Sequence, residues 1–199
     1  MARLIIISVI FCLVLQQAEG QPAVSLRLTV DGNQTDTIQR GEVLLMDIVL
    51  SNPAARSAAS WNRAASGHLE ELDETLKQKK ISQEEFDKEK KSIESKLRKA
   101  PVTTIGSEKE PWSQMIKWDV VKTGERSPLN WPVNYLINPR TDAVAVLDEH
   151  SYYFASYGIN TDAIAQLPEG SYEVIAILGE TRSNVVTIRI DGTSLPAEL

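Results

Sequence analysis

The stretch GEVLLMDIVLSNP, residues 41–53, decides the fold class. Its apolar side chains recur at every second position, at Leu44, Met46, Ile48 and Leu50. Asp47 lies on the opposite face. A period of two is the repeat of a β-strand, and the closing Ser51-Asn52-Pro53 contains residues that end strands. The stretch therefore predicts a strand with one apolar face, which we place centrally in a sheet.

Similar strands are predicted on both sides of this stretch. Residues 24–30 alternate in the same way and end in the turn residues 31–33. After Pro101, short segments rich in β-branched and aromatic residues follow at 115–121, 133–137, 143–147, 152–157, 172–178 and 185–190. Because no long helix separates them, we expect antiparallel pairing and two sheets packed face to face.

Two segments resemble immunoglobulin-like β-sandwich domains. LPEGSYEVIAIL (167–178) followed by SNVVTIRI (183–190) resembles their last two strands, and RGEVLLMDIVLSNP (40–53) is similar to an early strand of bacterial extracellular modules of this type. The resemblance implies a mainly β fold, an antiparallel immunoglobulin-like β-sandwich over residues 21–199.

The same resemblance assigns structural roles to particular residues. Tyr172 would form a corner by hydrogen-bonding back to the chain, and Trp118 is a candidate for the packed tryptophan of these folds. The cysteine pair of antibody-type domains is absent, and Ile48 and Val174 are its apolar stand-ins.

The chain begins with a pattern typical of a secretory signal. MARLIIISVIFCLVLQQAEG, residues 1–20, runs from Arg3 through an apolar stretch to small residues at Ala18 and Gly20. Cleavage after Gly20 would remove Cys12, the only cysteine, and with it any disulfide or cysteine-ligated metal. We expect a secreted or periplasmic protein whose mature chain has no integral membrane segment.

Net charge argues against nucleic acid as a partner. The formal charge is −6 at pH 7, and the basic residues are mostly interleaved with acidic ones. Nucleic acid and anionic lipid bind to clusters of Lys and Arg, and this sequence does not contain such clusters.

Between the predicted strands, residues 66–100 read as an inserted helical hairpin. Residues 54–66 are small and polar apart from Trp61 and are interpreted as a linker, whereas residues 68–99 are dense in Glu, Lys and Leu. Within residues 68–99 the apolar residues recur at the spacing of an α-helix, which predicts two helices. The predicted first helix carries Leu69, Leu72 and Leu76, and the second carries Phe86, Ile93 and Leu97.

The start of the second helix is the most specific local signal. Ser82 is the predicted N-cap, Glu85 completes a capping box with it, and Ile81 and Phe86 can form a hydrophobic staple. Residues 69–97 also resemble the SHOCT motif, a short bacterial helical hairpin with Ile, Ser or Thr, acidic residues and Glu-Phe at its turn. Lys80 stands where that motif commonly has Gly. The resemblance implies oligomerisation or partner contact.

These features predict an exported, non-catalytic binding protein in which the hairpin contacts a protein partner or a second copy. The candidate interaction residues are Leu72, Leu76, Phe86, Ile93 and Leu97. A charged surface insertion without a partner remains the alternative, because long surface insertions cost little.

Other chemistry is weakly signalled. Asp148-Glu149-His150 could hold a hard cation or act as acid and base, but a solvated turn between strands is favoured, and His68 is the only other histidine. No catalytic residue, metal or cofactor is predicted, since the usual nucleophile, zinc, phosphate and calcium motifs do not occur.

Two alternative functions stay open. A secreted hydrolase assembled from scattered residues is one. The other is a carbohydrate- or peptide-binding module using aromatic side chains, namely Trp112, Trp118, Trp131, Tyr152, Tyr153 and Tyr157. Core packing is expected to account for at least half of these aromatics. Asn33-Gln34-Thr35 matches a glycosylation pattern, which chance also explains.

Overall fold

The computed structural model describes residues 23–40, 44–125, 129, 133–136, 142–159 and 167–194. The chain divides into two compact units. The β unit comprises Val24–Ser51, Thr104–Leu147 and Ser151–Leu199. The helical unit contains Asn52–Thr103 and Asp148–His150. The predicted signal segment, residues 1–20, lies outside the described residues.

The fold is mainly β, with two main sheets in the β unit. The first has the strand order β1 (Ser25–Val30), β3 (Leu44–Ser51), β8 (Tyr153–Ile159), β6 (Val133–Leu136), with every pair antiparallel. The second has the order β10 (Thr181–Arg182), β9 (Gly170–Leu178), β11 (Val186–Ser194), β2 (Thr35–Arg40), and β5 (Lys117–Lys122) also pairs with β9. The strand predicted from residues 41–53 is central, as expected.

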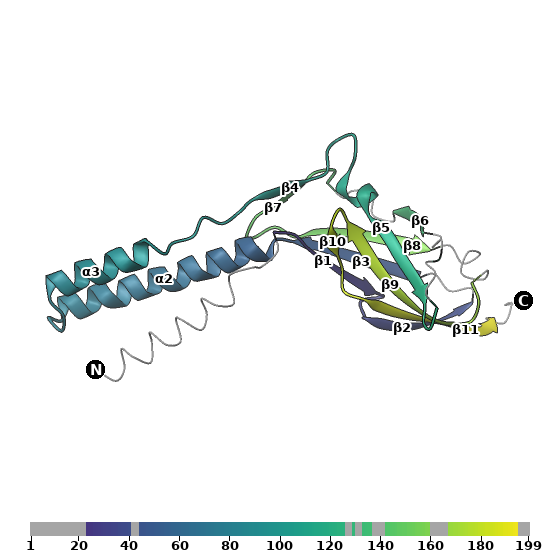
Figure 1. Cartoon of the computed structure of the whole chain (residues 1–199), viewed down its shortest axis with the longest axis horizontal. Coiled ribbons are helices and arrows are strands. Elements are labelled where there is room, and N and C mark those ends of the chain that lie inside the picture. Colours follow the sequence, from purple (N-terminus) through teal and green to yellow (C-terminus); the bar gives the residue numbers. More distant parts are fainter. Residues whose placement is uncertain are drawn as a thin grey trace, which may run out of the picture. The chain divides into compact units, whose positions relative to one another are not determined.

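Smaller elements complete the β unit. β4 (Thr103–Ile105) and β7 (Ala145–Leu147) form a two-stranded sheet, and the 3₁₀ helix η1 covers Trp112–Met115. Figure 1 shows how these strands and the two helices follow one another along the chain.

Three of the described strands were not predicted, namely β2, β4 and β10, and the pairing direction of β2 was also unexpected. β2 was not expected, and it pairs parallel to β11, whereas only antiparallel pairing was expected. Ile38 is the one apolar residue among the six of TDTIQR, and it is buried at 3% exposure. Because an edge strand at the end of a sheet needs few apolar side chains, so polar a segment gives little sequence signal.

A single hydrophobic cluster draws buried side chains from both sheets. The alternation predicted for β3 is present, since Leu44, Met46, Ile48 and Leu50 are all fully buried. Val174 of β9 is fully buried as well, so the two apolar stand-ins for a cysteine pair lie in the core, one from each sheet. The Tyr172 hydroxyl donates a hydrogen bond to the carbonyl of Pro168, so the implied bond back to the chain is present.

Side chains form hydrogen bonds with backbone groups of the edge strands β1 and β2. Asn184 accepts from the Leu28 N–H at 2.9 Å and donates to the Leu28 carbonyl at 2.9 Å, on β1. At the β2 edge, the Thr37 N–H donates to the carboxylate of Asp36 at 2.7 Å. Blocked edges resist pairing with further strands.

The helical unit holds α2 (Pro53–Lys77) and α3 (Gln83–Glu94). The linker predicted for residues 54–66 is wrong, because this segment is the first half of α2, so the hairpin is longer than the predicted 66–100. Its Ala-rich composition favours a helix. Asn52 is the N-cap, accepting from the Ala55 N–H at 2.9 Å, and Pro53 occupies the first helical turn, where its missing N–H costs nothing.

Candidate functional site

The helical hairpin is closed at one end by a small core. We call this core the hairpin base; it consists of Ala55, Ala58, Trp61, Ala65 and Ile93, all buried. Four of these residues lie on α2 and only Ile93 lies on α3. The alanines leave room for the single large ring of Trp61, which is 2% exposed.

The chain that leaves α3, residues 95–102, is irregular but firmly held. Trp61 donates its indole N–H to the Lys96 carbonyl at 2.9 Å. Asn62 donates to the Arg98 carbonyl at 2.7 Å and accepts from the Arg98 N–H at 3.0 Å. Asn52 donates to the Pro101 carbonyl at 3.0 Å. Side chains of α2 therefore take the place of the backbone partners that regular structure would supply to this return segment.

A charged ring contact reinforces the same place. The Arg98 guanidinium lies 5.6 Å from the centre of the Trp61 ring, within cation–π range. Trp61, Asn52 and Asn62 were not among the predicted site residues. Trp61 with alanines three residues before and four residues after it is a helical repeat, and it was the available sequence signal.

The predicted capping box at the start of α3 is present. The Ser82 N–H donates to Glu85 Oε2 at 2.9 Å, and the Glu85 N–H donates to Ser82 Oγ at 3.2 Å. Hydrogen bonds that the Ser82 N–H and then the Ser82 hydroxyl donate to the Glu85 carboxylate lower the pKa of Glu85 below its ordinary value. The start of α3 is therefore fixed at the residue that the sequence indicates.

The end of α2 is closed by backbone hydrogen bonds. The Lys79 N–H donates to the Leu76 carbonyl at 2.8 Å and the Lys80 N–H to the Thr75 carbonyl at 3.0 Å, which is the Schellman pattern. Lys79 adopts φ 54°, the left-handed conformation that Gly usually supplies at this position. Lys79 therefore occupies the position after the C-cap at which helices commonly have glycine.

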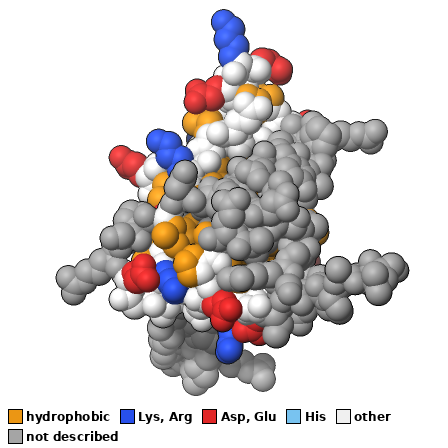
Figure 2. Space-filling view, turned by 90° about the vertical axis from the view of Figure 1, so that its right-hand side faces the viewer, with side chains coloured by type: hydrophobic (Ala, Val, Ile, Leu, Met, Phe, Trp, Pro, Cys, Tyr) orange, Lys and Arg blue, Asp and Glu red, His pale blue; other side chains and the backbone are white. Residues whose placement is uncertain are grey.

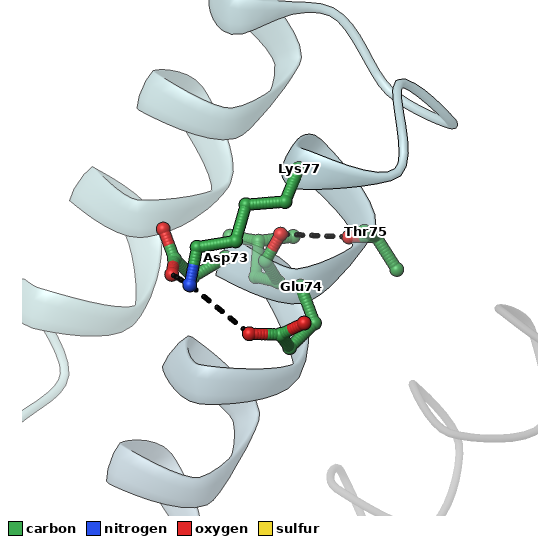
Figure 3. A network of polar contacts seen from close by, with 5 residues as sticks. Asp73, Glu74, Thr75 and Lys77 are labelled. Atoms are coloured by element: carbon green, nitrogen blue, oxygen red, sulfur yellow. Dashed lines mark hydrogen bonds and ion pairs between the residues drawn. The ribbon is translucent and has the colours of Figure 1, made fainter.

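Lys77 forms a small ionic network on α2 (Figure 3). Its ammonium lies 2.7 Å from the carboxylate of Asp73 and 3.0 Å from that of Glu74. Hydrogen bonds to Asp73 and then Glu74 raise the pKa of Lys77. All three side chains are largely exposed, so the network orders charges on the surface more than it stabilises the helix.

The tip half of the hairpin, residues 66–92, differs from the base because none of its side chains is buried. Its large apolar side chains are all half-buried, namely Leu69, Leu72, Leu76, Ile81 and Phe86. Of the predicted interaction residues, Leu72, Leu76 and Phe86 lie in this tip half, whereas Ile93 belongs to the base.

Leu97 was predicted on the second helix, which is wrong. α3 ends at Glu94, and Leu97 lies in the return segment with 46% of its surface exposed. Beyond Glu94 the chain is irregular, and the Asn62 side chain bonds both backbone groups of Arg98.

The acidic turn next to His150 joins β7 and β8. The His150 N–H donates to Asp148 Oδ1 at 2.8 Å, and His150 Nε2 lies 3.5 Å from Glu149. A carboxylate that accepts from the N–H two residues later is ordinary turn chemistry, in line with the interpretation favoured above. Within the described ranges, no group of three metal-ligating side chains is placed to hold a metal ion. His68 is half-buried on α2.

Several of the predicted aromatic residues pack in the β unit. Trp112 and Tyr157 are buried, and the Tyr157 hydroxyl donates to the Ser113 carbonyl. Burial raises the pKa of Tyr157. The Trp112 ring meets Tyr153 edge-on at 6.5 Å, and Trp118 meets Tyr157 edge-on at 5.3 Å.

Trp112 on η1 is fully buried, and Trp118 on β5 is half-buried and packs against the hydrophobic cluster. Of the remaining aromatics, Tyr152 is exposed, and Trp131 lies outside the described residues.

On the face drawn in Figure 2, acidic and basic side chains of the described residues are interspersed around hydrophobic ones. Comparison with protein-family models gave no match to this chain, and a search of curated proteins gave none either. Across the described ranges, the helices are all too short or too polar to cross a membrane.

Proposed function

We propose that this chain is an exported, non-catalytic binding protein, an immunoglobulin-like β-sandwich with a helical hairpin that contacts another protein chain. The strand orders β1-β3-β8-β6 and β5-β9-β11-β2 support the fold assignment. In the proposed fold they would take the places of the ABED and CFG sheets of the immunoglobulin fold, with β2 as an added strand beside the last one.

The tyrosine hydrogen bond supports the same assignment. Tyr172 lies near the start of β9 and bonds back to Pro168, four residues earlier. Val174, two residues further on, occupies the place where antibody-type domains have their second cysteine. In this numbering of strands, the hairpin is an insertion after the second strand of the sandwich.

The observation that carries the binding proposal is the contrast within the hairpin. At its base, the return segment and Trp61 complete a small buried core. In the tip half, Leu72, Leu76 and Phe86 are only half-buried. Since an apolar helix face is stable when it packs against another element, the tip half offers a surface that fits a second helical element from a partner.

The test replaces Leu72 and Phe86 with Asp in the full chain. We expect the double variant to lose association measured by light scattering and by crosslinked pull-down, with its far-UV circular dichroism retained. The control is Leu45→Asp, because Leu45 is an apolar residue with 38% of its surface exposed that lies on β3 of the β unit. An unchanged mass together with an unchanged pull-down would leave the hairpin as a surface insertion without a partner.

The aromatic alternative keeps one specific observation in its favour. Tyr152 is 51% exposed and Phe154 is 58% exposed, so two large rings near the start of β8 are accessible to a ligand. Sugar rings stack on such side chains. Titration with a glycan panel against a Tyr152→Ala, Phe154→Ala variant separates this function from protein binding.

A further inference from the structure

In the tip half of the hairpin, α2 and α3 each carry a short segment in which one sign of charge dominates. α2 carries a run of carboxylates at Glu70, Glu71, Asp73 and Glu74. α3 carries lysines at Lys88, Lys90 and Lys91, interrupted only by Glu89. One helix is thus acidic and the other mostly basic over these segments.

The two charged segments lie at the same level of the hairpin. Residues 70–74 precede the end of α2 at Lys77, and residues 88–91 follow the start of α3 at Gln83. At about 1.5 Å per residue, both segments lie roughly 5–12 Å from the tip end of their own helix. Because α2 and α3 run antiparallel, an acidic strip and a basic strip lie side by side.

Part of this charge has no counter-ion within the hairpin. The described ion pairs of the hairpin join Lys77 to Asp73 and Glu74, and Lys90 to Glu94. Among the described residues, no ion pair involves Glu70, Glu71, Lys88 or Lys91. A matching partner must therefore carry both signs of charge, separated onto two helices.

The hairpin itself meets this requirement. A second copy related by a twofold axis parallel to the helices places α2 of one copy over α3 of the other at the same level. Each acidic strip then faces a basic strip, and the symmetry makes this contact twice. The half-buried apolar side chains of the two tip halves then meet in the core of a four-helix bundle.

We infer that the partner of the tip half is the tip half of a second copy, with both tips pointing in the same direction. This inference rests on the proposed function, because it names the protein that the hairpin contacts. A partner of one dominant charge fits less well, since residues 70–91 hold eight carboxylates and six lysines and neither sign prevails.

Two charge-reversal variants of the full chain test the inference. One carries Glu70→Lys and Glu71→Lys, which takes the charge of residues 70–74 from −4 to zero beside the basic segment of α3, and the other carries Lys88→Glu and Lys91→Glu, which makes both segments acidic. We expect the wild-type chain to form dimers by light scattering and native mass spectrometry. Each variant alone should self-associate at least about tenfold more weakly, and an equal mixture should restore a heterodimer.

Several outcomes overturn the inference. One is a variant that self-associates as tightly as the wild type, and another is a mixture that stays monomeric while circular dichroism shows both variants folded. A monomeric wild-type chain that still captures a different protein, and loses it in the Leu72→Asp, Phe86→Asp variant, also overturns it. That last result leaves the proposed function standing, so the two failures are distinguishable.

Discussion

Replacing Trp61 with alanine should unfold the helical hairpin while the β unit stays folded. The ring is 2% exposed, and removing a buried tryptophan side chain costs about 3–5 kcal/mol. Loss of the indole hydrogen bond to the Lys96 carbonyl adds about 1 kcal/mol, and loss of the Arg98 contact about 0.5–1 kcal/mol. The sum is about 4.5–7 kcal/mol.

That loss is as large as the stability available to the hairpin. A folded segment of about fifty residues has a free energy of unfolding of roughly 3–8 kcal/mol at typical values per residue. Within the hairpin, only the four small or branched residues Ala55, Ala58, Ala65 and Ile93 share the base with Trp61. No other aromatic side chain of the hairpin is buried, so no neighbour can fill the space.

Hydrogen exchange of the full chain, read by mass spectrometry, measures the effect for each unit separately. Amides of α3 and of the return segment should lose protection in Trp61→Ala, while those of β3 and β9 keep it. Trp61→Phe is the matched control, because it retains a ring in the base and loses the indole N–H. We expect this control to cost about 1 kcal/mol and to remain helical.

Two results refute the reasoning. If α3 is as well protected in Trp61→Ala as in the wild type, Trp61 does not hold the base. If β3 and β9 lose protection together with α3, the two units do not unfold separately.

Three further substitutions have expected outcomes that follow from local geometry. Lys79→Gly should stabilise the hairpin by about 1 kcal/mol in thermal or urea unfolding, because Lys79 holds φ 54°, and Gln78→Gly, at φ −77°, should not. The capping box stabilises the fold only while the Glu85 carboxylate is ionised, because the folded state lowers the pKa of that group. Its contribution should therefore fall as the pH drops below 4.5, the ordinary pKa of a glutamate, and be lost as the pH passes the lowered pKa of Glu85. Helix content followed by circular dichroism should drop there in the wild type and lose this dependence in Ser82→Ala; an identical acid profile in both would contradict the assignment. Gly106→Ala should destabilise the β unit by at least about 2 kcal/mol, because φ is +83° and the added Cβ would lie 2.4 Å from the Ala143 carbonyl oxygen and 2.6 Å from the Trp112 nitrogen. Gly124→Ala is its control, with a similar φ of +91° and open space, and an equal loss in both would attribute the effect to conformation alone.

The strands with strong apolar alternation could be predicted from the sequence, and so could the start of α3. In β3 the period of two alone separates core from surface. In α3, Ser82 and Glu85 must fall three residues apart, and few other patterns imitate this. These signals are local, so they need no knowledge of the rest of the chain.

The first half of α2 was missed because two features of the sequence have more than one meaning. Asn52-Pro53 ends a strand, but it is also a helix N-cap followed by the proline that favours a first helical turn. Alanine and serine are common in linkers, yet alanine is also the best helix former. Only the pairing of Trp61 with the return segment decides between these readings, and that contact spans thirty-five residues.

Three asparagines perform a task that no sequence pattern reveals. A side-chain amide offers a donor and an acceptor, as a peptide group does. Asn184 uses both on Leu28 of β1, Asn62 uses both on Arg98, and Asn52 donates to Pro101. Asn52 is also an ordinary cap residue and Asn184 an ordinary turn residue, whereas Asn62 lies within α2, so the sequence around each asparagine does not indicate its distant backbone partner.

The side-chain hydrogen bonds to the backbone of β1 and β2 limit how a partner can bind. An edge strand or irregular segment with open backbone groups invites another chain to add a strand, but Asn184 occupies β1 at Leu28 and Asp36 occupies the Thr37 N–H at the β2 edge. What the described hairpin leaves open is side-chain surface: half-buried leucines and unpaired charges in its tip half. Burial of each further methylene there contributes about 0.8 kcal/mol, so packing against the leucines would supply most of the affinity and the charge strips would set the alignment. A peptide designed to add a strand at β1 should therefore fail to compete with association through the hairpin, whereas a peptide of residues 66–92 should compete if association runs through the tip halves.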